Sequence, residues 1–245
     1  MPHSDAVAPP SGPSAPTNLQ TVRAEIDRVD EALLELMERR LATSLAIAEL
    51  KKDASSAHLL LHPDREQHVL DRLAGRATRM SPAAIGVIWR ELMALNLQTQ
   101  RRMEIVLHAT EQPVLVTDEA RRRFGCAAPI VVAGSAEDAL ERARTREAVA
   151  VVELNPVSSW WIELFNEQSL VIFDYLRGAG RVSALAIGRV GADTLAPGLS
   201  FPIMAEASLR QRIAAGETIR PLAISGHLRL CLCEDPDAAG PGQAG

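Results

Sequence analysis

The sequence predicts a multidomain chain, with an all-helical region followed by a small α/β domain. Apolar residues recur at steps of three and four from Leu19 to Leu50, and no glycine or proline interrupts them. That spacing is typical of one long helix of about nine turns. After Pro113 the sequence pattern changes, and short runs rich in β-branched residues alternate with polar, helix-like stretches. This alternation indicates an α/β domain with a partly parallel sheet.

Three helices are expected within residues 18–109. Thr17 and Gln20 fit a capping box in front of the long first helix. A helix this long needs a partner along its apolar face. Pro63 suits the first turn of a short second helix, which should end near Gly75.

The third helix has a strong start signal in Ser81 and Pro82, an N-cap residue followed by a first-turn proline. We expect it to run to about His108. The two ends of the chain, residues 1–17 and 235–245, are rich in proline, alanine, serine or glycine and are expected to be disordered tails.

The α/β domain is expected over residues 113–234. Two stretches within it have helical composition, SAEDALERARTR and SSWWIELFNEQ. Six runs are interpreted as strands: PVLVTD, PIVVAG, AVAVVEL, SLVIFDYL, RVSALAIGRV and LRLCLCE. No glycine-rich dinucleotide motif, P-loop or nucleophile elbow occurs among them.

Composition excludes several classes of function. The net charge of −5 and the pI near 5.7 leave no basic surface for nucleic acid. No apolar run is long enough to cross a bilayer. Cys231 and Cys233 alternate as on one face of a buried strand, and Cys126 makes the count odd, so neither a disulfide framework nor a zinc site is expected. We therefore expect a reducing, cytoplasmic location.

Cations on the first helix indicate an anion site. Arg40 and Lys51 are eleven residues apart, so they share a helix face and lie about 16 Å apart. Two cations on one face can bracket a small anion. Arg23 lies about 25 Å before Arg40, too far for the same ligand within one chain. A second protomer packed antiparallel would bring Arg23 there.

Polar residues on the other two helices fit the same ligand. Asn96 and Gln100 are four apart on the third helix among apolar neighbours, and buried amides need partners. Arg65 and Glu66 begin the short second helix. Each has a plainer interpretation, because charged helix residues are normally solvated and Asn96 could join two helices. His62 suits a turn. Spacing alone predicts an anion-binding helical dimer.

The combined pattern resembles the all-helical class of chorismate mutases. The resemblance covers about residues 19–104. Three segments carry the resemblance: LQTVRAEIDRVDEALLELMERRLATSLAIAELKK, HPDREQHVLDRL and IWRELMALNLQTQ. Across them, in chain order, the pattern is R-x-x-I-D-x-x-D, then R-R, then a lysine, then R-E, and finally a glutamine. The family forms an intertwined homodimer of three-helix protomers, which agrees with the reach of Arg23.

The resemblance implies a role for each matched residue. Arg23 would cross into the partner's site to hold a substrate carboxylate, and Arg40 would hold a carboxylate in its own site. Lys51 and Gln100 would hydrogen-bond the ether oxygen of the breaking bond. Glu66 would bind the ring hydroxyl.

Three further positions are implied to contact substrate more peripherally. Arg65 would lie either behind the residues that touch the substrate or near a carboxylate. His62 occupies a position where related enzymes often have aspartate, and Asn96 one where serine is common. These two departures bear on affinity more than on chemistry.

The implied activity is the rearrangement of chorismate to prephenate in phenylalanine and tyrosine synthesis, an isomerase reaction without metal or cofactor. Two alternatives remain. One is an isochorismate pyruvate lyase, which uses a similar cationic pocket. The other is a non-catalytic binding or regulatory protein of the same pathway, in which the α/β domain senses a ligand.

The segment SAEDALERARTREAVAVVELNPVSSWW faintly resembles part of a prephenate dehydratase domain. The threonine-arginine-phenylalanine triplet of that active site is absent. The resemblance therefore implies a degenerate, non-catalytic relative. Asn155, Ser158 and Ser159 could line a cleft there, although loop capping is the commoner use of such residues.

Overall fold

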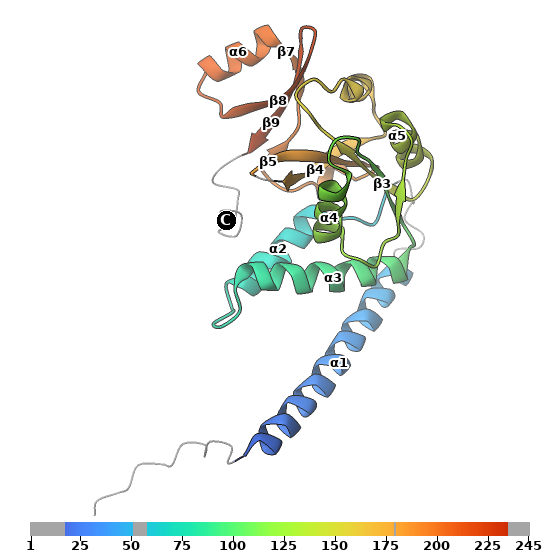
Figure 1. The fold of residues 1–245 in the computed structure, drawn as a ribbon, viewed down its shortest axis with the longest axis vertical. Coiled ribbons are helices and arrows are strands. Elements are labelled where there is room, and N and C mark those ends of the chain that lie inside the picture. Colours follow the sequence, from blue (N-terminus) through green and yellow to red (C-terminus); the bar gives the residue numbers. More distant parts are fainter. Residues whose placement is uncertain (1–17, 51–57, 179, 235–245) are drawn as a thin grey trace, which may run out of the picture. The chain divides into compact units, whose positions relative to one another are not determined.

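A computed structural model describes residues 18–50, 58–178 and 180–234 (Figure 1). The chain divides into two compact units, residues 1–44 and 45–245. The first unit holds most of helix α1 (Leu19–Leu50), and the second holds the last residues of α1 and all other elements. Each unit is described on its own.

Helix α1 is the long helix that the apolar spacing predicts, 32 residues without a break. Its first turn is capped by Asn18, whose Oδ1 accepts hydrogen bonds from Thr21 N at 2.9 Å and Thr21 Oγ1 at 3.2 Å. Thr17, proposed for that role, lies outside the described residues. None of the α1 side chains is buried. The exposed apolar residues of its first five turns are Leu19, Val22, Ile26, Val29, Leu33, Leu34, Leu36 and Met37.

Helices α2 (Pro63–Ala74) and α3 (Pro82–Gln100) begin where their prolines predict. Ser81 caps α3, because its hydroxyl accepts a hydrogen bond from Ala84 N at 3.2 Å. The expectation that the third helix continues to about His108 is wrong. Residues 104–108 are extended instead, because they pair with strands on both sides.

The central sheet of the second unit has five strands in the order β2-β1-β3-β5-β4. Strand β1 is parallel to both of its neighbours, whereas the other pairings are antiparallel. The partly parallel sheet is therefore confirmed. Its strands are β1 (Glu104–His108), β2 (Ile130–Val132), β3 (Ala148–Glu153), β4 (Val171–Gly178) and β5 (Arg181–Gly188).

Apolar side chains cover both faces of this sheet. Helix α4 (Pro113–Phe124) packs on one face, together with Leu97 of α3 and with Leu59 and Leu61 before α2. Helix α5 (Ala136–Thr145) and the 3-10 helix η1 (Trp160–Asn166) pack on the other. Alternate residues of β3 serve the two cores, as a sheet buried on both faces requires.

Helix α4 corrects an expectation, since the sequence predicts a strand for its first six residues, PVLVTD. Val116, Ala120 and Phe124 recur at four-residue steps and are all buried. Pro113 occupies the first turn, where a missing N–H is harmless. The apolar triplet at the start of the run hid this longer helical period.

A second sheet lies beyond residue 198, where only the last strand was predicted. Strand β9 (Leu228–Glu234) pairs antiparallel with β8 (Ile219–Ser225) and with two short strands, and helix α6 (Glu206–Ala214) follows the second of these. Cys231 is buried on β9 and Cys233 half-buried, and both are free thiols. The short strands are β6 (Leu199–Ser200) and β7 (Ile203–Ala205).

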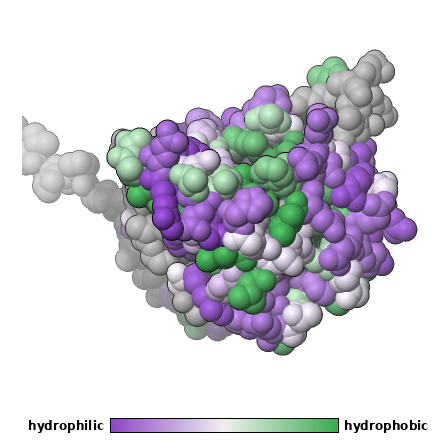
Figure 2. Space-filling view, turned by 90° about the horizontal axis from the view of Figure 1, so that it is seen from above, coloured by the Kyte–Doolittle hydropathy of each residue, from purple (hydrophilic) through white to green (hydrophobic). Residues whose placement is uncertain are grey.

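The helical N-terminal region is thus followed by a region of mixed sheets and helices. On the face in Figure 2, apolar side chains occur in small groups among polar ones, as is normal for a protein surface. Among the described residues, no helix is both long and apolar enough to cross a lipid bilayer.

Candidate active site

The residues predicted on α2 and α3 lie within the second unit. Asn96 is buried, and Gln100, one turn later, is half-buried. On α2, Glu66 and the preceding His62 are half-buried, and Arg65 is exposed. Asn96 therefore has the burial expected of an amide with a partner, whereas Arg65 has that of a solvated cation.

The predicted site residues on the first helix differ in solvent exposure. Arg23 is exposed, and Arg40 is half-buried, with burial lowering the pKa of its guanidinium. Lys51 lies outside the described residues. Because Arg23 and Arg40 belong to the first unit, their meeting with the α2 and α3 residues stays a prediction.

Glu66 has a partner that the sequence did not indicate. Its Oε2 lies 2.8 Å from Nη1 of Arg123, near the end of α4. Nε of Arg123 in turn donates to Oδ2 of Asp174 on β4. The three side chains are only 16 to 20% exposed, so the ion pairs are shielded from solvent. One guanidinium therefore joins a carboxylate of α2 to a carboxylate of the sheet.

Arg90 of α3 contributes a second cation to this cluster. Burial, and then the charge of Arg123, lowers its pKa, while Asp174 and Glu66 oppose the change. Burial alone would also lower the pKa of Arg123, but the charges and hydrogen bonds of Glu66 and Asp174 outweigh it and raise that pKa. Two cations and two carboxylates thus balance in one half-buried cluster.

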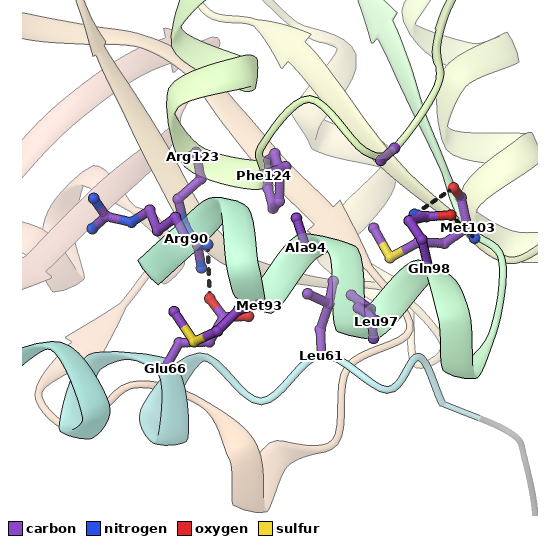
Figure 3. Close-up of a pocket in the computed structure, with 11 residues that line it drawn as sticks. Leu61, Glu66, Arg90, Met93, Ala94, Leu97, Gln98, Met103, Arg123 and Phe124 are labelled. Carbon is purple, nitrogen blue, oxygen red and sulfur yellow. Dashed lines mark hydrogen bonds and ion pairs between the residues drawn. The ribbon is translucent and has the colours of Figure 1, made fainter. Parts of the chain in front are cut away.

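Next to this cluster lies a small pocket between α2, α3 and α4 (Figure 3). Glu66 and Arg123 point toward each other at one end. At the other end Gln98 donates to the carbonyl of Met103 at 2.9 Å and accepts from its N–H at 3.3 Å, so its amide holds the start of β1. Between these ends the lining is mainly apolar and includes Leu61, Met93, Ala94, Leu97 and Phe124.

The α3–α4 junction explains why Arg123 is held at this place. Gly125 ends α4 at φ +73°, and a Cβ there would lie 2.6 Å from Cβ of Ala94 on α3. Glu91 of α3 accepts the N–H of Cys126 with both oxygens, at 3.1 and 2.8 Å. Only glycine meets both the backbone conformation and the close approach.

A second polar cluster lies at the carboxyl ends of the parallel strands β1 and β3. Glu153, the last residue of β3, is buried, and its carboxylate accepts three backbone hydrogen bonds. They come from Thr110 N at 2.7 Å, Glu111 N at 2.8 Å and Gln112 N at 2.9 Å. These N–H groups precede α4, where a negative charge is favourable. The chain's own carboxylate thus occupies this anion-binding position.

In the loop after β3, side chains likewise accept hydrogen bonds from the protein's own backbone N–H groups. Ser158 Oγ accepts from Asn155 N at 3.0 Å, and Asn155 Oδ1 accepts from Val157 N at 3.1 Å. Ser159 precedes η1 without a side-chain capping bond. For Asn155 and Ser158 the structure therefore supports loop capping rather than a cleft.

Arg90, Arg123, Asp174 and Glu153 were not singled out from the sequence. Arg123 had a usable signal, because it lies seven and three residues after the buried Val116 and Ala120, on one face of a helix. The strand predicted over residues 113–118 hides that signal. Among the described residues, no group of three His, Cys, Asp or Glu side chains is arranged to hold a metal ion.

Comparison with known proteins bears on the helical region first. Residues 22–101 match the chorismate mutase type II family. The match begins within the first turn of α1, includes α2 and α3, and contains each of the eight residues predicted for the site. It stops before β1, so Arg123 and Asp174 lie outside it.

A relative extends the similarity beyond that domain. The chain is 24% identical over 165 residues to a bifunctional chorismate mutase/prephenate dehydratase of Aquifex aeolicus (strain VF5). The alignment covers 63% of this chain and 44% of the relative, so the chain spans less than half of that protein. No solved structure matches significantly.

Proposed function

We propose that this chain is a chorismate mutase, which rearranges chorismate to prephenate within the cytoplasm as a step of phenylalanine and tyrosine synthesis. The observation that carries the proposal is the chorismate mutase type II match over residues 22–101. The complete polar set from Glu66 to Gln100 leans against isochorismate lysis, and the match leaves that activity and a purely regulatory role less favoured.

The reaction is unimolecular, so the site needs to orient one molecule and stabilise its transition state. In our proposal Arg23 of a second protomer and Arg40 hold the two carboxylates, with Arg65, His62 and Asn96 nearby, and this selects the compact reactive conformer. Lys51 and Gln100 donate to the ether oxygen, where negative charge grows as the bond breaks. Glu66 accepts from the ring hydroxyl. No metal or cofactor takes part.

The dimer is part of the proposal for two reasons. Helix α1 has an apolar stripe but no buried side chain, and such a stripe requires a partner. Along the helix, Arg23 lies about 25 Å from Arg40, beyond the reach of one small ligand. A symmetric homodimer meets both requirements, because it covers the stripe and brings Arg23 to the partner's site.

For the C-terminal region we propose a non-catalytic relative of a dehydratase domain. The bifunctional relative supports the kinship. The position of Glu153 supports the lack of catalysis, because it already uses the backbone N–H groups at the end of β1, where α/β domains commonly bind ligands.

The test is to add chorismate to the purified protein and follow its consumption, identifying the product before and after acid treatment. Prephenate should accumulate and give phenylpyruvate only after acid. Lys51→Ala should lower kcat about 100-fold or more, as loss of one donor to a developing oxyanion does. Lys52→Ala is the matched control and should stay near the parent.

Each other outcome has a definite meaning. Near-normal turnover by Lys51→Ala would contradict the assignment of the site. Phenylpyruvate formed without acid would show that the C-terminal region is an active dehydratase. No consumption at all would favour the binding-protein alternative.

A further inference from the structure

The ion cluster at Arg123 connects the matched helical region to the region beyond it. Glu66 lies within residues 22–101, whereas Arg123 and Asp174 belong to α4 and β4. Arg123 contacts both carboxylates, at 2.8 Å for Glu66 and through Nε for Asp174. The two regions are thus joined at a residue proposed to contact substrate.

The surroundings of Arg123 hold it in one place. Its guanidinium carbon lies 5.0 Å from the ring centre of Phe124, which makes an edge-to-face contact with Phe173 of β4. Asp174 follows Phe173 directly on the strand. Removing one partner of such a shielded pair leaves an uncompensated charge, so the arrangement resists displacement.

The bond to Arg123 leaves Glu66 able to serve a ligand. A carboxylate offers about four acceptor positions on its two oxygens, and Arg123 takes one of them through Oε2. Fixing one oxygen by an ion pair orients the other. An oriented acceptor binds a hydroxyl at lower entropic cost than a freely rotating one.

We propose that Arg123 is a positioning residue for the mutase site, which acts through Glu66 and is itself held by Asp174. This inference rests on the proposed function. It gives the C-terminal region a role in the mutase reaction that requires no second active site. Arg123 itself touches no reacting atom.

The experiment measures kcat and KM for chorismate in the full-length chain with Arg123→Ala, Glu66→Gln and the double variant. Arg122→Ala is the matched control, because Arg122 is a neighbouring cation of α4, 71% exposed and paired with Glu119. Arg123→Ala should raise KM about tenfold with a smaller change in kcat, as expected for lost binding of the hydroxyl.

The double variant gives the decisive comparison. If Arg123 acts through Glu66, adding Arg123→Ala to Glu66→Gln should change kcat/KM by less than about twofold. If the losses of kcat/KM in the two single variants multiply in the double variant, the inference is overturned, because Arg123 then acts by a route other than Glu66. A higher kcat/KM for Arg123→Ala would also overturn it and identify the contact as inhibitory. So would an effect no larger than that of Arg122→Ala.

Two further variants guard against loss of folding. Arg123→Lys keeps the charge but not the geometry by which one guanidinium binds two carboxylates. Its KM should therefore lie between those of the parent and Arg123→Ala. Asp174→Asn leaves Arg123 in the chain and should raise KM in the same direction. A rise in KM with Asp174→Asn supports the inference even if Arg123→Ala does not fold, and an unchanged KM then overturns it. If the parent chain does not consume chorismate, the proposed function has failed and the inference falls with it.

Discussion

The carboxylate of Glu153 lies 2.9 Å from the backbone nitrogen of Gln112, and it also accepts from the two preceding N–H groups. These groups belong to the three residues that directly precede helix α4, the last of which is its N-cap. A buried carboxylate at the end of β3 therefore fastens the loop after β1, and charge-assisted bonds of this kind are the stronger ones.

Replacing this carboxylate should destabilise the protein. Glu153→Gln keeps the shape but loses the charge, and its amide NH2 faces donors rather than acceptors. We expect the free energy of unfolding to fall by about 2 kcal/mol, the usual range for leaving buried groups unpaired being about 1–3 kcal/mol. Urea denaturation measures it. Glu163→Gln, at an exposed glutamate of η1, should change it by less than about 0.5 kcal/mol. Equal stabilities for the two variants would contradict the role given to Glu153.

The pKa of Glu167 predicts how stability changes in acid. Hydrogen bonds from the backbone and hydroxyl of Ser169, both at 2.7 Å, and then from Arg144, lower that pKa from 4.5 to about 2. Since the folded-state pKa is the lower one, the stabilising contribution is complete above about pH 4.5 and is lost as the pH falls toward 2.

The variant Glu167→Gln tests this dependence. At pH 7 it should be less stable than the parent by about 1 kcal/mol, a figure that allows for solvent screening. The difference should shrink steadily between pH 4.5 and 2. Urea denaturation at pH 7, 4 and 3 measures it, with Glu163→Gln as the control for loss of one carboxyl. A difference that stays constant with pH would rule out ionisation as its cause.

Helices α1 and α2 and the start of α3 were predictable because their signals are local. Pro63, Ser81 and Pro82 mark helix starts by their own backbone preferences, and the apolar spacing of α1 needs no tertiary contact to be seen. The end of α3 was not predictable in this way. Residues 104–108 hold a short apolar run that is compatible with helix or strand, and pairing with β2 and β3 makes them a strand.

The candidate site was only partly predictable, for the same physical reason. Sequence spacing places Asn96 and Gln100 on one face of a helix, and Asn96 is indeed buried. Sequence spacing cannot show that Glu66 meets Arg123, since 57 residues separate them and only the packing of α4 on the sheet brings them together. The helical spacing from Val116 and Ala120 indicates which of the three arginines turns inward, but it does not name the partner of Arg123.

The dimer proposal makes a prediction that two inactive variants can test together. If Arg23 acts in the partner's site and Lys51 in its own, a mixed dimer of Arg23→Ala and Lys51→Ala has one site with both changes and one site with neither. Coexpression should give about half mixed dimers, each with one intact site. Activity should therefore return to about a quarter of the parent value.

The matched control uses two changes that each alter only the site of the protomer that carries them. Arg40→Ala and Lys51→Ala are both assigned to a protomer's own site, so a mixed dimer of these two variants should leave each site with one defect. Coexpressing them should restore no activity, and chorismate consumption per mole of protein measures both mixtures. If the mixture with Arg23→Ala also stays inactive while the parent is active, Arg23 does not reach across an interface.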